Sequence, residues 1–211
     1  MTSQNFPDAA AIWNQRFSEP EFLFGTSPNA YLASQRHLFD SGKSALAVAD
    51  GEGRNSVWLA QQGLVVDAFD ISIVGVAKAR QLARQADTTV NFNVSDCDAW
   101  PWKPAAYDYV VAVFVQFANP DMRRRLFTNM VTALKPGGHL ILQGYTPKQL
   151  EFNTGGPGIL AHLYTEDLLR SAFSELHISD MKMYEEVLSE GKQHSGLSAL
   201  IGMVGQKPDG M

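Results

Sequence analysis

The sequence is poor in cysteine and in basic residues. Its 211 residues include a single cysteine, Cys97, so a disulfide within the chain is excluded. Lys and Arg number 17 against 22 Asp and Glu, which gives a net charge of −5. Because contacts to phosphates need clustered positive charge, we expect no nucleic-acid partner. The one basic run, Arg123–Arg125, falls in an expected helix and is interpreted as a solvated face.

Long apolar runs and leader-like patterns are also missing. No run approaches the ~20 apolar residues that cross a bilayer, and the opening MTSQNFPDAA has no basic segment followed by an apolar one. A single cysteine is typical of a reducing compartment. We therefore expect a cytoplasmic protein with no membrane partner. A monomer and a homodimer are both compatible with the sequence.

Several catalytic motifs are absent from the sequence. There is no H-E-x-x-H and no paired C-x-x-C, so we expect no dedicated metal site. There is no G-x-S-x-G, which argues against a serine hydrolase, and no G-x-x-x-x-G-K-[ST], which argues against a nucleoside triphosphatase.

What the chain does contain, after residue 43, is a regular alternation of strand and helix signals. Apolar runs occur at 45–49, 64–69, 90–94, 109–115 and 139–143, and helix-like segments occur at 54–62, 72–85 and 121–134. Unbroken apolar strands that alternate with helices indicate a parallel sheet covered on both faces. Asn119-Pro120 marks a helix start, and Lys135-Pro136-Gly137-Gly138 marks a helix end. The fold class predicted is therefore α/β, doubly wound.

The two ends of the chain depart from this alternation. Residues 8–17 have helical spacing, and Ser27-Pro28 is expected to begin a second helix that carries apolar residues as far as Phe39. After the fifth strand come a glycine-rich loop (153–158), a helix from Thr165, and strand-like runs near 176–184 and 197–204. We predict one domain over 1–211, with N-terminal cap helices in 1–42 and the core in 43–211.

The first strand leads into VADGEGRNSVWLAQQG, residues 48–63, where a doubly wound sheet places its ligand. Gly51 and Gly53 let the backbone approach a ligand closely, but Ser56 occupies the third glycine position of a dinucleotide fingerprint. Asp50 and Glu52 would repel a diphosphate by roughly a kcal/mol or more each at short range. The turn therefore favours a ligand with an ammonium group.

S-adenosylmethionine has that ammonium group, a positive sulfonium and an adenosine. Asp70 lies 17 residues after Gly53, at the end of the second strand, where a carboxylate accepts from ribose hydroxyls. Asp96 follows the third strand and is expected to accept from the adenine amino group. The ordered set favours S-adenosylmethionine as cofactor and S-adenosylhomocysteine as product.

At these motifs the sequence resembles the class I S-adenosylmethionine-dependent methyltransferases, over about residues 44–145. GEGRNSVWLAQQGLVVDAFD and WNQRFSEPEFLFGTSPNAYL are similar to the bacterial tellurite-resistance methyltransferases and their thiopurine-methyltransferase-like relatives. The resemblance implies a seven-stranded Rossmann-like sheet with an antiparallel last strand and an N-terminal helix that closes over the cofactor. Ala47 and Ala49 stand where the family usually has an acid and a glycine, and Asp50 would supply the missing charge.

Further residues are expected at the cofactor. Ile71 would cover the adenine, Cys97 would contribute a backbone N–H to it, and Val113 and Phe114 would line the floor. Arg54 would pair either with the cofactor carboxylate or with solvent-facing acids; both interpretations remain open.

The N-terminal cap offers Trp13 and Arg16 to the cofactor. An aromatic ring that faces a sulfonium gains about 1 kcal/mol of cation–π stabilisation. At helical spacing, Trp13 is equally compatible with plain packing.

Three residues are candidates for acceptor contact: His194, Tyr145 and His162. A histidine at position 194 could take a proton from the acceptor or bind an oxyanion. In the tellurite-type relatives the matching histidine is followed by an arginine, whereas this chain has Ser195. Each of the three candidates also has a purely structural interpretation.

The function predicted is methyl transfer to a small acceptor with a soft sulfur, selenium or tellurium atom. Two alternatives stay open. A nicotinamide (NAD)-dependent oxidoreductase would share the glycine turn and Asp70. A non-catalytic S-adenosylmethionine-binding protein is suggested by Ala47 and Ala49.

Overall fold

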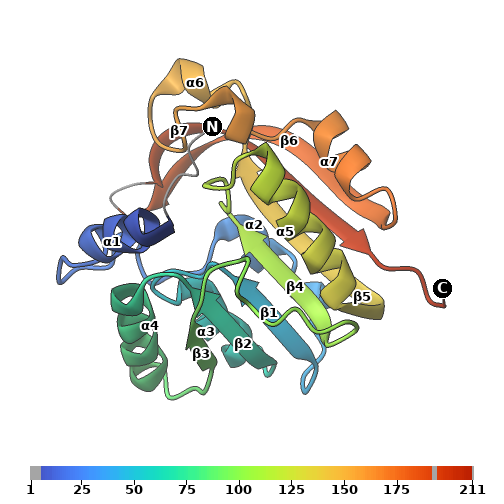
Figure 1. Ribbon diagram of the computed structural model, residues 1–211, viewed down its shortest axis with the longest axis horizontal. Coiled ribbons are helices and arrows are strands. Elements are labelled where there is room, and N and C mark those ends of the chain that lie inside the picture. Colours follow the sequence, from blue (N-terminus) through green and yellow to red (C-terminus); the bar gives the residue numbers. More distant parts are fainter. Residues whose placement is uncertain (1–5, 192–193, 211) are drawn as a thin grey trace.

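The computed structural model describes residues 6–191 and 194–210, and the strands of this part form one seven-stranded sheet (Figure 1). The strands are β1 (Ser44–Val48), β2 (Val65–Asp70), β3 (Asn91–Val94), β4 (Tyr107–Val113), β5 (Leu134–Tyr145), β6 (His177–Glu190) and β7 (His194–Gln206). Their order is β3-β2-β1-β4-β5-β7-β6. Strand β7 is antiparallel to β5 and β6, and the other neighbours are parallel. The predicted doubly wound α/β fold with an antiparallel last strand is confirmed.

Helices connect the strands and cover both faces of the sheet. They are α1 (Phe6–Arg16), α2 (Ala30–Ser34), α3 (Arg54–Gln61), α4 (Ile73–Gln85), α5 (Pro120–Ala133), α6 (Gln149–Phe152) and α7 (Glu166–Ala172), with 3-10 turns η1 (Arg36–Leu38) and η2 (Leu160–His162). In Figure 1, α5 and α7 lie in front of the sheet and α2 lies behind it. No helix in the described residues is both long and apolar enough to cross a membrane.

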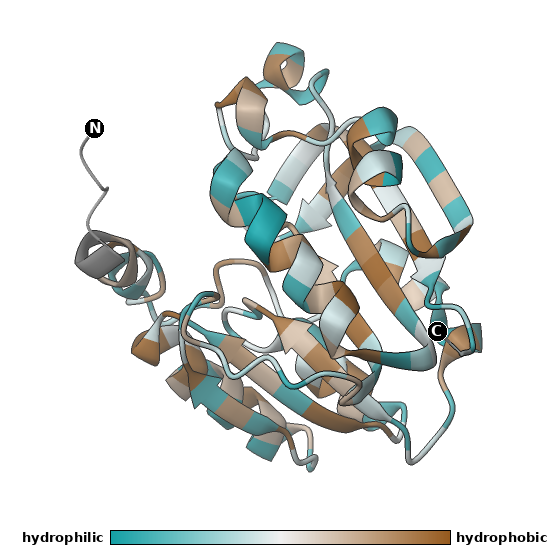
Figure 2. Cartoon of the chain, turned by 45° about the vertical axis from the view of Figure 1, so that its right-hand side comes forward, coloured by the Kyte–Doolittle hydropathy of each residue, from teal (hydrophilic) through white to brown (hydrophobic). Residues whose placement is uncertain are grey.

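The core follows from the alternation of side chains along the central strands. In β4, Val110 and Ala112 pack with α5 residues on one face, while Tyr109 and Val111 pack with Leu32 on the other. The strands at the centre of the molecule are mostly coloured apolar, whereas the helices carry both apolar and polar colours (Figure 2). A strand buried on both faces reads as a continuous apolar run, and the sequence showed such runs.

Side-chain caps fix where the helices begin. Asn119 accepts from the backbone N–H of Met122, and Pro120 is the first residue of α5, as its sequence predicted. Ser72 and Thr165 cap α4 and α7 in the same way. These short-range signals explain why the predicted starts of these helices were correct.

Besides the last two strands, a helix and a strand near the site differ in extent from the prediction. The second N-terminal helix was expected to begin at Ser27-Pro28, but Asn29 accepts from Leu32 N and starts α2 only at Ala30. That helix ends after one turn and continues as η1. Strand β5 was expected from residue 139, but it begins at Leu134, which pairs with Tyr107 directly after α5 ends.

Candidate active site

The strand order places the candidate site between β1 and β4. The chain runs outward from β1 to β3 and then returns to β4 on the other side of β1, which is the switch point where such sheets bind ligands. Ala49 and Phe114, which directly follow these two strands, have φ of 48° and 56°. Non-glycine residues rarely adopt such angles, and they concentrate at functional sites. Backbone strain therefore flanks the point where a ligand is expected.

The glycine turn (residues 50–53) needs glycine for two different reasons. At Gly53 φ is +91°, and a Cβ would lie 2.6 Å from the Cβ of Ala79 in α4. Gly53 thus allows α3 and α4 to approach closely. At Gly51 φ is +60°, and a Cβ would lie 3.2 Å from the Phe17 ring, so Gly51 makes room beneath an aromatic residue.

Asp70 joins the end of β2 to the glycine turn. Its carboxylate accepts from Gly51 N at 2.9 Å and from Ser72 N at 2.8 Å. Burial raises the pKa of Asp70 to about 6, against the lowering effect of these two hydrogen bonds. Each carboxylate oxygen has two acceptor sites, so Asp70 retains capacity for the hydroxyls of a ligand.

Asp50 faces the start of α3. It accepts from the backbone N–H of Ser56 at 3.3 Å and from the Ser56 hydroxyl. Burial raises the pKa of Asp50 to about 7. Ser56, which in the sequence only marked a departure from the dinucleotide fingerprint, is therefore the partner of Asp50. Ala47 lies in β1, fully buried.

The negative charge of Glu52 is compensated by an ion pair, so it does not add to the charge of Asp50 and Asp70. Glu52 forms an ion pair with Lys78 of α4 and accepts from Leu23 N at 2.7 Å. Two carboxylates with raised pKa values therefore remain at the switch point, the partly exposed Asp50 and the buried Asp70. A cationic ligand would compensate them, and a diphosphate would not.

Asp96 and Cys97, which were predicted to meet the adenine, already make hydrogen bonds within their own loop. One oxygen of Asp96 accepts from the backbone N–H groups of Asp98 and Ala99, and the Cys97 carbonyl accepts from the Trp102 indole. The Cys97 thiol is buried, which raises its pKa, so it remains protonated. Ile71 is half-buried beside Asp70.

The N-terminal segment reaches the glycine turn through Phe17, a residue that the sequence analysis did not select. Phe17 is buried and stacks on Trp13 with ring centroids 5.3 Å apart. The Arg16 guanidinium lies 4.3 Å from the centroid of the Trp13 ring, so a cation–π contact at Trp13 is made within the chain. Arg16 thus packs on Trp13, and Trp13 packs on Phe17, which lies next to the glycine turn.

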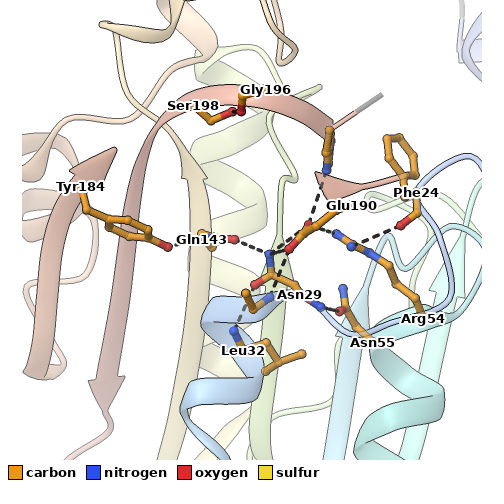
Figure 3. Close-up of polar contacts among 12 residues, drawn as sticks. Phe24, Asn29, Leu32, Arg54, Asn55, Gln143, Tyr184, Glu190, Gly196 and Ser198 are labelled. Carbon is orange, nitrogen blue, oxygen red and sulfur yellow. Dashed lines mark hydrogen bonds and ion pairs between the residues drawn. The ribbon is translucent and has the colours of Figure 1, made fainter. Parts of the chain in front are cut away.

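Arg54 has a partner that neither sequence interpretation anticipated. Its guanidinium lies 2.7 Å from Glu190, at the tip of β6, and the two side chains are 7% and 10% exposed. Arg54 also donates to the Phe24 carbonyl at 3.3 Å. Figure 3 shows Glu190 at the centre of these contacts, with Asn29 beside it. A buried ion pair therefore ties the first residue of α3 to the β6–β7 hairpin.

Two of the three predicted acceptor residues lie together. His194 is buried, with its ring centroid 4.3 Å from Phe114, 4.5 Å from Phe24 and 5.8 Å from Tyr145. Tyr145 also stacks on Phe114 at 4.7 Å. We call these four residues the aromatic cluster. Val113, the residue before Phe114, is half-buried.

The aromatic cluster holds two buried polar atoms that lack a hydrogen bond to the described residues. They are the Tyr145 hydroxyl and the Nδ1 atom of His194. A buried polar group without a partner costs about 1–3 kcal/mol, so such atoms usually serve a ligand or a mechanism.

His162, the third predicted residue, has a different role. Its Nδ1 lies 2.9 Å from the Gln116 carbonyl, and the Gln116 amide donates to the backbone of His162 and of Tyr145. These contacts fasten η2 to the end of β4. Across residues 6–191 and 194–210, no three His, Cys, Asp or Glu side chains gather as a metal site would require.

Comparisons with known proteins relate the part of the chain that carries this site to a methyltransferase domain. Residues 45–138, which include the glycine turn, Asp70 and Asp96, match the family model described as "Methyltransferase domain". The chain is 26% identical to phosphoethanolamine N-methyltransferase 2 of Caenorhabditis elegans over 168 residues, 73% of this chain and 38% of that protein. It spans at most half the length of the curated relatives it matches.

Solved structures share the fold. One, from work on the conversion of a disulfide bond into a thioacetal group during echinomycin biosynthesis, has a TM-score of 0.74 and 18% identity, covering 95% of this chain and 93% of that chain. TehB from Haemophilus influenzae has a TM-score of 0.69 and 14% identity, covering 94% of this chain and 66% of that chain. Neither comparison points to a nicotinamide-dependent oxidoreductase. Residues 45–138 are thus similar to a methyltransferase domain, and the described chain has the seven-stranded fold of these solved structures.

Proposed function

We propose that this chain transfers the methyl group of S-adenosylmethionine to a small acceptor whose nucleophile is a soft sulfur, selenium or tellurium atom. The observation that carries the proposal is the aromatic cluster, whose Phe114 directly follows β4 at the switch point and whose Tyr145 hydroxyl and His194 Nδ1 make no hydrogen bond within the described residues. An apolar aromatic lining with few polar groups suits a small, polarisable acceptor better than a strongly hydrated one.

The cofactor side has residues that fit each part of S-adenosylmethionine. Asp70 would accept from the ribose hydroxyls, and Asp50 would compensate the positive charge of the ammonium and sulfonium groups. Asp96 and Cys97 would meet the adenine, with Ile71 covering it. When bound, S-adenosylmethionine supplies a methyl group that is activated by its positively charged sulfur.

The protein mainly positions the reactants and excludes water. Holding two reactants in line can supply about 7–11 kcal/mol of barrier reduction. The side chains that keep the site apolar are Phe17, next to Gly51, and Phe24 and Phe114, whose rings both contact His194. His194 and Tyr145 supply the polar atoms nearest to the acceptor.

The tellurite-resistance and thiopurine-methyltransferase group is part of this proposal. The G-x-G-R-N-S turn and His194 support it, and Ser195 in place of the relatives' arginine argues against an oxyanion acceptor. The named relatives do not define the acceptor, because the C. elegans protein is named for an amine.

A substitution at Asp70 tests the cofactor assignment. We expect Asp70→Ala to weaken S-adenosylmethionine binding about 5- to 150-fold, because charge-assisted hydrogen bonds worth ~1–3 kcal/mol are lost. Isothermal titration calorimetry measures this change. Asp67→Asn, in the same strand but bonded to Tyr107 and Asn91, is the matched control and should leave the affinity unchanged.

The same experiment separates the alternatives. An unchanged dissociation constant in the Asp70→Ala protein removes Asp70 from the site. Tight binding of NADH but not of S-adenosylmethionine would instead establish the oxidoreductase. Transfer of a labelled methyl group is then assayed with thiols, selenite and tellurite, and cofactor binding without turnover on any of them would favour a non-catalytic binding protein.

A further inference from the structure

Glu190 is the residue through which the two halves of the site meet. Its carboxylate lies 2.7 Å from Arg54 Nη2, accepts from Asn29 Nδ2 and Ala30 N at 3.1 Å each, and lies 3.8 Å from Nδ1 of His194. Arg54 follows the glycine turn, whereas His194 belongs to the aromatic cluster. One buried acid thus contacts both the cofactor side and the acceptor side.

The charged groups around His194 oppose one another. Glu190 of β6 favours the protonated imidazole, while Arg54 of α3 and Arg16 of α1 disfavour it. The hydroxyl of Tyr145 in β5 is protonated, because burial raises its pKa. Burial lowers the pKa of His194, so its neutral form predominates at neutral pH. Against burial, which raises it, His194, Arg54 and the backbone N–H of Ala30 keep the pKa of Glu190 at about 2, so Glu190 is ionised at neutral pH.

We infer that Glu190 is a positioning residue for His194 and that it determines which acceptors the site admits. A carboxylate beside Nδ1 favours the tautomer that carries its proton on Nδ1, which leaves Nε2 free to accept a proton. The distance of 3.8 Å is longer than a hydrogen bond, so Glu190 acts on Nδ1 of His194 through its charge.

The same charge acts on specificity, and this part rests on the proposed function. Arg54, the cation nearest to Glu190, is already paired with it, so it is not available to an anionic acceptor. Arg54 therefore offers no free charge to an oxyanion, whereas a neutral thiol needs none. The neutral thiol gives its proton to His194, its sulfur forms the new bond to the methyl carbon, and S-adenosylhomocysteine leaves as a neutral thioether.

The first test needs neither cofactor nor acceptor. The imidazole of His194 is titrated by NMR, with its resonances assigned by their loss in His194→Gln. We expect Glu190→Gln to lower the pKa of His194 by about one unit or more, and Arg54→Met to raise it, because the two neighbouring charges have opposite signs. Glu186→Gln, an exposed acid on the same strand, is the control and should leave the titration unchanged.

Opposite shifts in the two variants support the inference, because loss of packing alone would not reverse sign between them. An unchanged His194 titration in Glu190→Gln, or the same shift in Glu186→Gln, overturns it. If Glu190→Gln does not fold, Glu190→Asp replaces it, and the sign of the Arg54→Met shift decides.

The second test measures acceptor choice. In the wild-type protein we expect methylation of a neutral aliphatic thiol to exceed that of tellurite and selenite at least tenfold, with the ratio reduced in Glu190→Gln. The acid limb of the pH profile for the thiol should also move to lower pH in that variant. Preference of the wild-type protein for an oxyanion overturns the specificity part, while absence of methylation on every acceptor overturns the proposed function and leaves the NMR result standing.

Discussion

At the scale of single residues, Asp50 is the acid that we propose to compensate for Ala47. Burial holds its pKa at about 7, so near neutral pH it is only partly ionised. The charged form is penalised in the folded protein, and the unfolded chain loses its proton at a lower pH. The contribution of Asp50 to stability therefore falls as pH rises from about 4 to above 7.

Asp50→Asn mimics the protonated acid and should remove this dependence. Relative to the wild-type protein, we expect the stability of Asp50→Asn to be higher at pH 8 than at pH 4.5 by about 1–3 kcal/mol, because the wild-type protein loses stability as pH rises between the two values. Urea unfolding at the two pH values measures the difference. An identical difference at both pH values would show that Asp50 does not titrate as a buried group.

The affinity for the cofactor should depend on the charge of Asp50 in the opposite sense from the stability of the protein. A cationic ligand favours ionised Asp50, so its affinity for the wild-type protein should decline between pH 8 and pH 6.5, with a smaller decline in Asp50→Asn.

Site contacts between residues close in the sequence could be predicted, whereas contacts that the fold makes between distant parts of the chain could not. Asp70 follows the glycine turn at a spacing that strand–helix–strand geometry fixes, and it does contact Gly51. Phe17 and Glu190 reach the site from opposite ends of the chain, and no local pattern records that contact. The only available signal for Glu190 was its position four residues before His194.

At the scale of elements, the packing of α3 against α4 depends on Gly53. We expect Gly53→Ala to destabilise the protein by about 2–4 kcal/mol, since φ is +91° and the added Cβ would meet Ala79 at 2.6 Å. Chemical denaturation gives the free energy of unfolding.

The control for that substitution is Gly158→Ala, in the glycine-rich loop. Nothing lies within 4 Å of its added Cβ, and its φ is not positive, so we expect a change below about 0.5 kcal/mol. Equal losses in the two variants would mean that close approach at Gly53 is unimportant.

The sequence patterns did not predict the full length of the last two strands. The runs near 176–184 and 197–204 became strands of 14 and 13 residues, because β6 and β7 pair with each other from His177↔Gln206 to Glu190↔His194. In β6 most side chains are exposed, so its outer half lacks the apolar run that identified β1 or β4. Pairing between strands, and not local preference, extends them.

At the scale of the whole molecule, the glycine turn, the N-terminal segment and the β6–β7 hairpin form one connected unit. Glu52 binds Leu23, Arg54 binds Phe24 and Glu190, and Asn29 binds Glu190. Opening of one of these segments would therefore break its contacts with the others.

Hydrogen exchange measures that connection. We expect S-adenosylmethionine to slow amide exchange in residues 17–30 and at the hairpin tip as well as in the glycine turn, because local opening of one segment breaks contacts to the others. The far end of α4, around residues 82–88, is the internal reference. Protection limited to the glycine turn would show that the segments open independently.

The position of β7 has a consequence for how the protein is made. Strand β6 has no partner in the sheet except β7, which lies between it and β5 although it follows both in the chain. On the ribosome, a chain completed only to residue 190 could fold its parallel strands and still leave β6 unpaired. His194, the first residue of β7, reaches its aromatic neighbours only after β7 has paired with β5 and β6. A nascent chain could therefore form the glycine-turn side of the site before the side that holds the aromatic cluster.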